Sequence, residues 1–204
     1  MSQKLLGDAR LYALIAHVDS EFAAETHAAG CGCGGKLHRA NYPRQSRGGP
    51  KDLGEEWGLR FSFCCANDGC RKRATPPSVR FLGRRVYLGA VVVLLSAMTL
   101  GVTAKRAAEL GKLVGVDVRT LERWRRWWRE TFPVSRVWKA AKARFAPAVE
   151  TKRLPASLLD RFNATDEYGG LVAVLELLAP LTTTSNSRSE MINPYPQRRR
   201  LGMS

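Results

Sequence analysis

Apolar residues recur at helical spacing over most of the chain, and one short stretch alternates as a strand does. The longest apolar run, residues 86–100 (VYLGAVVVLLSAMTL), is apolar on nearly all sides, which predicts a buried helix. Residues 59–65 (LRFSFCC) alternate with a period of two, which predicts a strand. Further helices are expected over residues 5–28, 137–145, 154–162 and 171–178. The pattern therefore predicts a mainly α fold with a small β element.

The clearest periodic pattern, in residues 102–132, has the features of a helix-turn-helix. Such a motif needs a small residue where its two helices cross, a glycine at the turn, and apolar residues at fixed positions on both helices. Gly111 supplies the small residue and Gly115 the turn, with apolar residues at the required positions around them. The apolar run at 86–100 supplies a preceding helix, so residues 78–135 are expected to form a three-helix unit.

The second helix of this motif, expected over residues 117–130, has an apolar stripe and a basic face. Leu121, Trp124 and Trp128 recur at helical spacing, so they are expected to pack inward and not to stack on bases. Trp127 is the one tryptophan for which stacking stays open. In a recognition helix, N-terminal residues reach base edges and later arginines contact phosphates. The expected base-reading residues are Arg119, Thr120 and Arg123, and the expected backbone contacts are Arg126 and Arg129.

The charge of the chain is concentrated around this motif. The 204 residues include 33 Lys and Arg against 18 Asp and Glu, which gives a formal net charge of +15. Residues 71–136 carry a net charge of +11, whereas residues 1–70 are net neutral and residues 137–204 carry +4. A localised excess predicts a phosphate-binding surface, with a generally basic, ribosome-like surface as the alternative. A basic junction expected to follow the DNA backbone consists of Arg71, Lys72, Arg73, Arg84 and Arg85.

The five cysteines fall into two groups about thirty residues apart. Cys31 and Cys33 lie in a glycine-rich segment, Cys64 and Cys65 end the predicted strand, and Cys70 follows it. This is the layout of a zinc ribbon, in which two tight turns converge on one tetrahedral ion. The first pair is spaced CxC and the second Cx4C, neither of which is the commonest zinc knuckle. A cluster of free buried thiols is therefore the alternative.

Five thiols compete for four positions in such a site. Cys65 shares a strand face with Phe61 and Phe63 and lies nearer the turn that leads to Cys70, so it is preferred over Cys64. One structural Zn²⁺ is expected on Cys31, Cys33, Cys65 and Cys70, with Cys64 as the reserve ligand and His38 as a weaker substitute. A catalytic zinc would need an open coordination position and a general base, and the sequence contains no HxE or HExxH arrangement.

The sequence shows no targeting pattern. Asp8, Arg10, His17 and Asp19 interrupt the N-terminal segment, so it does not resemble a secretory signal. The apolar run at 86–100 is shorter than the roughly 20 residues that span a bilayer. We therefore expect a protein of the bacterial cytoplasm, associated with the nucleoid and not with a membrane. In that reducing compartment, metal binding by cysteines is favoured over disulfides.

The segment CCANDGCRKRATPPSVRFLGRRVYLGAVVVLL resembles the N-terminal zinc ribbon and following helix of certain insertion-sequence transposases. The segment GVDVRTLERWRRWW is similar to the DNA-binding modules of transposases and transposon-accessory proteins. The resemblance covers about residues 30–135. It implies binding to transposon ends or a nearby target through the ribbon, Arg119 and Arg123, with a transposase or another mobile-element subunit as partner.

The chain departs from a full transposase after Phe132. Transposases of this kind hold two metal ions about 4 Å apart with three carboxylates of an RNase-H-like domain. Only 72 residues follow Phe132, and they lack the alternating strand pattern of that domain. We therefore expect a non-catalytic, sequence-specific double-stranded DNA-binding protein that acts as a mobile-element accessory or regulatory factor. The alternatives are a transposase-like enzyme with an unrecognised carboxylate site at Asp160 or Asp166, and an RNA-binding zinc-ribbon protein.

These expectations divide the chain into five parts. They are an N-terminal helix (1–29), a zinc ribbon (30–75), a helix-turn-helix domain (78–135), C-terminal helices (136–180) and a disordered basic tail (181–204). The apolar helix expected over 171–178 is either a core element or the contact face of a homodimer.

Overall fold

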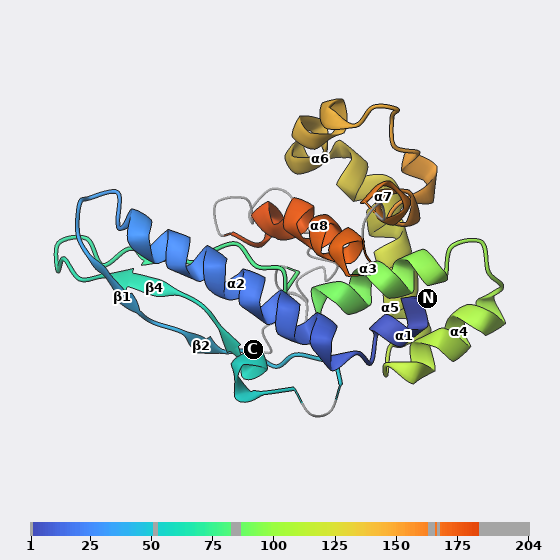
Figure 1. Ribbon diagram of the computed structural model, residues 1–204, viewed down its shortest axis with the longest axis horizontal. Helices are drawn as coiled ribbons and strands as arrows, with labels where there is room; N and C mark the ends of the chain where they lie inside the picture. The colour runs from blue at the N-terminus through green and yellow to red at the C-terminus, as the bar shows by residue number, and fades with distance from the viewer. Residues whose placement is uncertain (1, 51–52, 83–86, 163–165, 167, 184–204) are drawn as a thin grey trace, which may run out of the picture.

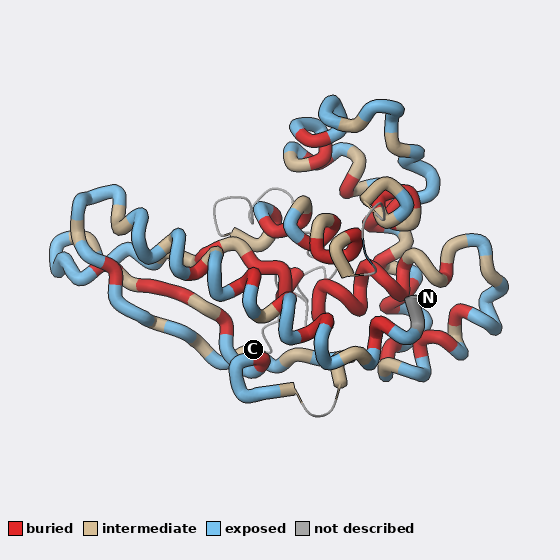
Figure 2. The backbone as a smooth tube through the Cα atoms, in the orientation of Figure 1, coloured by how far each residue is buried: buried red, intermediate tan, exposed pale blue. Residues whose placement is uncertain are grey.

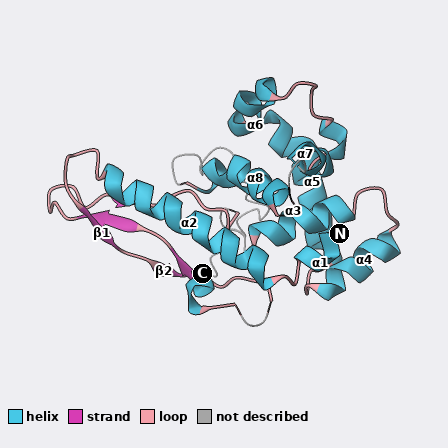
Figure 3. Cartoon of the chain, viewed as in Figure 1, coloured by secondary structure: helices cyan, strands magenta, loops and turns pink. Residues whose placement is uncertain are grey.

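The computed structural model describes residues 2–50, 53–82, 87–162, 166 and 168–183. This part of the chain is mainly helical with a small antiparallel sheet, which confirms the expected fold class at that level (Figures 1 and 3). The sheet lies beside one long helix at one end of the longest axis, and most of the other helices lie towards the opposite end (Figure 1). The expected tail lies outside the described residues from 184 onward.

Helices precede and follow a segment of short strands along the chain. The α-helices are α1 (Ser2–Leu5), α2 (Ala9–Ala29), α3 (Gly89–Met98), α4 (Ala104–Leu113), α5 (Val118–Arg126), α6 (Arg136–Ala141), α7 (Ala156–Phe162) and α8 (Gly169–Leu178). The strands are β1 (Leu37–Arg39), β2 (Tyr42–Pro43), β3 (Leu59–Arg60), β4 (Phe63–Cys65) and β5 (Arg73–Ala74). Short helical turns are η1 (Glu55–Gly58), η2 (Trp127–Thr131), η3 (Phe132–Val134), η4 (Lys142–Arg144), η5 (Thr151–Arg153) and η6 (Ala179–Thr182).

The helix expected over residues 5–28 is divided near its start. α1 ends at Leu5, and α2 begins at Ala9 because the carboxylate of Asp8 accepts a hydrogen bond of 3.0 Å from the backbone N–H of Arg10. α2 ends at Gly30, whose φ of +69° is readily reached only by glycine. The rest of the expected helix is continuous for 21 residues.

The sheet has the strand order β1-β4-β5, and β2 and β3 form a separate two-stranded pair. The strand expected over residues 59–65 is interrupted at Ser62, whose N–H donates to the side chain of Asn41 at 3.1 Å, so it becomes β3 and β4. α2 covers one face of the sheet, where Ala23 packs in a small core with Leu37 and Phe63. This small core is separate from the large one among the helices.

The large core surrounds α3. Residues 89–96 are all buried, which confirms the helix expected to be apolar on every side (Figure 2). α3 contacts α5 and α8, and α8 is itself mostly buried. The apolar segment at 171–178 is therefore a core element within this chain. No described helix is both long and apolar enough to cross a membrane.

The tryptophans of α5 and η2 belong to the core. Trp124, Trp127 and Trp128 retain 3%, 5% and 1% of their exposure, so the open question at Trp127 is settled in favour of packing. Phe132 stacks edge-on against Trp128, with ring centroids 5.0 Å apart. The helical path continues past Arg126 through the π-helical turn η2, which makes room for these adjacent large rings.

A buried ion pair that the sequence did not predict joins α2 to the segment before α3. The Arg80 guanidinium donates to the Asp19 carboxylate at 2.7 Å, and both side chains are fully enclosed. Asp19 also accepts hydrogen bonds from the Ser78 hydroxyl at 3.0 Å and the Val79 N–H at 2.6 Å. Arg80 lies over the ring of Phe61 at 4.6 Å. The pair fixes the middle of α2 against the helical core.

Candidate metal centre and nucleic-acid interface

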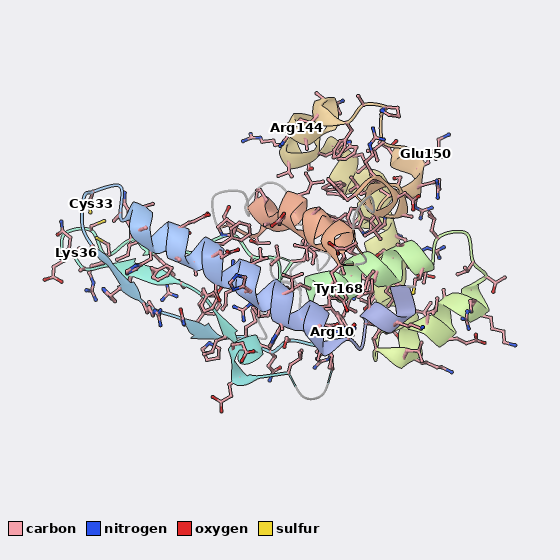
Figure 4. The ribbon with its side chains drawn as sticks, viewed as in Figure 1. Arg10, Cys33, Lys36, Arg144, Glu150 and Tyr168 are labelled. Atoms are coloured by element: carbon pink, nitrogen blue, oxygen red, sulfur yellow. The ribbon has the colours of Figure 1, made fainter. Side chains whose placement is uncertain are left out.

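Four cysteine sulfurs lie together at the sheet end of the molecule. The Sγ atoms of Cys31, Cys33, Cys65 and Cys70 are all within 4.8 Å of one another. Cys31 and Cys33 come from the turn after α2, Cys65 ends β4, and Cys70 lies in the turn before β5 (Figure 4). The closest pairs are Cys33 with Cys65 at 3.5 Å and Cys31 with Cys70 at 3.7 Å. These are the four sulfurs that the sequence predicted as ligands.

The backbone of both turns is shaped to bring the sulfurs together. The N–H of Gly34 donates to the Cys31 carbonyl at 2.8 Å, and the φ of Gly34 is +81°. A Cβ atom on Gly35 would lie 2.6 Å from the Cys65 sulfur, so only glycine fits there. On the other turn, the N–H of Asn67 donates to the Cys65 sulfur at 3.4 Å. Such N–H groups stabilise thiolate charge.

Cys64 and His38 do not belong to this group. They lie opposite each other in the register of β1 and β4, one position away from the pair Leu37 and Cys65. Because side chains alternate along a strand, Cys64 points to the other face of the sheet. Its Sγ lies 3.5 Å from the backbone oxygen of Arg71. The face alternation that favoured Cys65 as the ligand agrees with this arrangement.

The pKa values of three cysteines in the cluster are shifted in different directions. The N–H of Gly35 and the neighbouring thiols lower the pKa of Cys33 to about 7. At Cys65, the N–H of Asn67 lowers the pKa, but desolvation and the neighbouring thiols raise it to about 12. The pKa of Cys70 is also raised, although the N–H of Lys72 opposes this. Neighbouring thiolates repel one another, so each disfavours ionisation of the next. A cation that binds all four sulfurs would stabilise their charged forms.

The second candidate site is the pair of helices α4 and α5 at the other end of the molecule. A Cβ atom on Gly111 would lie 2.5 Å from the Val116 carbonyl, so the helices approach closely only because this residue is glycine. The N–H of Val116 donates to the Gly111 carbonyl at 2.8 Å, and Gly115 has a φ of +65° in the turn. The side chain of Asp117 caps α5 by accepting from the N–H of Arg119 at 2.8 Å.

The expected DNA contacts on α5 differ in exposure. Arg119, Arg126 and Arg129 are exposed, and Arg123 is half-buried. Thr120 is only 8% exposed, and its hydroxyl accepts a hydrogen bond of 2.6 Å from Arg123. Thr120 therefore orients Arg123, and its role as a base contact stays a prediction.

Two residues that the sequence did not single out hold α5 in place. The guanidinium of Arg125 donates to the Thr99 carbonyl at 2.6 Å and thereby caps the end of α3. The phenol of Tyr87 donates to the Gly115 carbonyl at 3.1 Å, and its ring meets Trp124 edge-on with centroids 5.2 Å apart. Tyr87 lies near the start of the apolar run, and nothing in the sequence pattern indicates its hydrogen bond to Gly115.

The expected basic junction is not one surface adjoining α5. Arg71 and Lys72 lie in the cysteine turn and Arg73 in β5, and all three are exposed. They therefore lie at the sheet end, whereas α4 lies at the opposite end of the longest axis (Figure 1). These three cations precede α3 in the sequence, which suggested that they lie near it. The pairing of β5 with β4 instead places them at the sheet end. Arg84 and Arg85 lie outside the described residues.

The two carboxylates weighed as a catalytic site have other partners. Asp160 accepts a hydrogen bond of 3.2 Å from Arg153. Asp166 accepts from the backbone N–H groups of Tyr168 and Gly169, at 2.7 Å and 2.5 Å, just before α8. Among the described residues, the four cysteines are the one group of His, Cys, Asp and Glu side chains arranged to hold a metal. No family model, curated protein or solved structure matches the chain.

Proposed function

We propose that this chain is a sequence-specific double-stranded DNA-binding protein that places α5 in the major groove. The observation that carries the proposal is the division of α5 into two faces. Leu121 and Trp124 are buried against the helical core, while Arg119 and Arg126 remain exposed on the outer side. The turn between α4 and α5 is the tight, glycine-dependent connection that a helix-turn-helix requires. Arginine on such a helix pairs with guanine edges and with phosphates.

Duplex DNA fits this surface better than RNA does. The major groove of B-DNA is about 12 Å wide and admits an α-helix, whereas the corresponding groove of A-form RNA is deep and narrow. Proteins that read single-stranded RNA commonly stack bases on exposed aromatic rings. Trp127 and Trp128, the aromatic residues next to the exposed arginines, are buried in the core. Their burial removes them as a stacking platform.

We also propose that the four-cysteine cluster holds one structural Zn²⁺. Four thiolates in tetrahedral arrangement are the donor set of structural zinc sites, and all four positions are then filled by protein. The ion would supply cross-linking of the two turns and no chemistry on a substrate. Cys31 and Cys33 would fix the chain after α2, and Cys65 and Cys70 would fix the end of the sheet.

The biological role that we propose is that of a non-catalytic accessory or regulatory factor of a mobile element, in the bacterial nucleoid. The resemblance to the DNA-binding regions of insertion-sequence transposases supports this setting, and a transposase subunit is the corresponding protein partner.

Selection from a randomised duplex library tests the DNA proposal. We expect a defined motif, whose affinity falls steeply as salt is raised. Arg119→Ala should relax the base preference at one position of the motif by about 1–3 kcal/mol. Arg126→Ala should weaken binding to all duplexes alike and reduce the slope of log affinity against log salt concentration by about 1. Lys152→Ala removes an exposed charge from η5 and serves as the matched control. Equal affinity for every duplex, or preference for structured RNA in competition, would contradict the proposal.

A further inference from the structure

The sheet end of the molecule carries a second group of cations, of which Arg73 lies on the sheet face that α2 leaves uncovered. α2 packs on Phe63, and the His27 ring nitrogen bonds the Leu37 carbonyl at 2.9 Å, so this face of β1 and β4 is closed. In the strand register, His38, Cys64 and Arg73 lie side by side on the opposite face. His38 and Arg73 are exposed. The Arg73 guanidinium donates to the Ala40 carbonyl and the Ser62 hydroxyl, each at 3.3 Å, and lies 5.8 Å from the centroid of the Tyr42 ring.

The cations at this end come from two distant parts of the sequence. Lys36 precedes β1, and its carbonyl accepts from the N–H of Ala66 at 2.8 Å, which places it at the cysteine turns. Arg71, Lys72 and Arg73 reach the same end from the other turn. Figure 4 shows Lys36 beside Cys33 at the tip of the molecule. We refer to Lys36, Arg71, Lys72 and Arg73 as the cationic ribbon surface.

This surface has few acidic residues to balance it. Residues 31–50 contain no acidic residue, and Asp68 is the one acidic residue of residues 59–82. Asp68 is fully exposed and lies 3.7 Å from Arg71. Exposed pairs of this kind are weak, so the pair can exchange for a phosphate at little cost. Lys36, from the net-neutral N-terminal part, thus joins the cations of the basic segment at this end.

The cationic ribbon surface lies far from α5. The cysteine turns follow the C-terminal end of α2, while Leu11 and Tyr12 near its start pack in the helical core. A helix of 21 residues is about 30 Å long, because each residue adds about 1.5 Å. Figure 1 shows α2 running from the cysteine turns towards the helical core, with α5 beyond its start, so the separation is the length of α2 or somewhat more. One turn of B-DNA is of similar length, about 34–36 Å.

We infer that the cationic ribbon surface binds the phosphate backbone of the duplex that α5 reads, about one helical turn to one side of the groove that α5 enters. The inference rests on the proposed function and adds a second contact to it. Lysine and arginine side chains at the sheet end would contribute charge and not base recognition, because they would meet only phosphates. The footprint of one chain is therefore long and asymmetric.

Two duplexes separate this contact from recognition by α5. The short duplex ends just beyond the selected motif. A long duplex carries, in addition, about one and a half turns of arbitrary sequence on one side of the motif. A second long duplex carries the same extension on the other side. The wild type should bind the correct long duplex about tenfold more tightly at low salt, with a salt slope steeper by about 2. Hydroxyl-radical footprinting should show backbone protection about one turn from the motif, on that side only.

A double variant, Lys36→Gln with Lys72→Gln, removes half of the cationic ribbon surface without touching a cysteine. It should bind the short duplex as the wild type does and lose the gain on the long one. Lys139→Gln with Lys142→Gln, which removes two exposed charges from α6 and η4, should keep that gain. Metal content and thermal midpoint of each variant show that the fold is intact.

The outcomes separate this inference from the proposed function. Equal wild-type affinity for the short and long duplexes, with a preserved motif preference, overturns the second contact and leaves α5 as the reader. Equal loss by the double variant on both duplexes also overturns it, since the cations would then act within the motif. Absence of any motif preference overturns the proposed function and the inference with it.

Discussion

The phenol of Tyr168 donates a hydrogen bond of 2.6 Å to the carboxylate of Asp8, although 160 positions separate them in the sequence. Asp8 caps α2, and Tyr168 directly precedes α8. Arg10 completes the group, with its guanidinium 3.1 Å from the same carboxylate and 5.8 Å from the Tyr168 ring centroid (Figure 4). Three side chains thus fasten the C-terminal helices to the N-terminal helix.

This cluster predicts a loss of stability in acid. Hydrogen bonds from Arg10 and Tyr168 lower the pKa of Asp8 from 3.8 to about 2. The stabilisation is therefore complete above about pH 4 and is lost as the pH falls to about 2. Asp8→Asn should lower the thermal midpoint at pH 7, and its difference from the wild type should vanish towards pH 2. A difference that stays constant over this range would contradict the assignment. Tyr168→Phe should remove part of the same effect.

The buried pair of Asp19 and Arg80 predicts a large effect of removing one partner. Asp19→Ala should destabilise the chain by roughly 3–5 kcal/mol, because it leaves the Arg80 guanidinium enclosed without a counter-charge. Urea unfolding measures this change. The double variant Asp19→Leu with Arg80→Met should be more stable than Asp19→Ala alone, since it buries no unpaired charge. A double variant less stable than the single one would show that packing, and not charge, decides the cost.

The two glycines of the α4–α5 connection should respond differently to substitution. Gly111→Ala brings a methyl group against the Val116 carbonyl and should cost about 1–3 kcal/mol and displace α5, so DNA affinity falls as well. Gly115→Ala meets no neighbour but strains a positive φ, and should cost about 1 kcal/mol. Gly115→Asn should be milder, because asparagine tolerates that conformation. Chemical unfolding and duplex affinity together distinguish these cases, and equal effects at both glycines would contradict the close approach at Gly111.

The cysteine cluster predicts one metal ion per chain. Elemental analysis should find one Zn²⁺ in the wild type and in Cys64→Ser, and much less in Cys65→Ser. Chelation should lower the thermal midpoint of the first two proteins and leave Cys65→Ser nearly unaffected, because binding energy at such a site is folding energy. Two ions per chain, or metal loss in Cys64→Ser, would contradict the assignment of Cys65.

The sequence revealed those features that depend on spacing along the chain. The period of apolar residues predicted α3 and the inward packing of Trp124 and Trp128, and face alternation along the strand singled out Cys65 from Cys64. Each of these signals is local, since side-chain direction follows from residue number once the element is known.

The features that were missed depend on contacts between distant segments. Asp19 and Arg80 are charged residues that are usually exposed, and only the packing of α2 against the segment before α3 encloses them. Arg73 was grouped with Arg84 and Arg85 in one basic junction, but its strand partner Cys64 places it on the sheet. Strand pairing and long-range packing leave no periodic trace from which a single sequence would reveal them.

α2 takes part in two separate cores, and this gives the chain two levels of cooperativity. Its first half packs through Leu11 and Ile15 among the helices, whereas Ala23 belongs to the small core beside the cysteines. A core of so few side chains cannot by itself offset the conformational entropy of the ribbon, so we expect its persistence to depend on the proposed metal cross-link between its turns. Backbone hydrogen exchange along α2 should therefore be graded, with protection beyond Asp19 that follows metal occupancy and protection before it that does not. The supply of metal in the cell would then decide how much of this helix remains ordered.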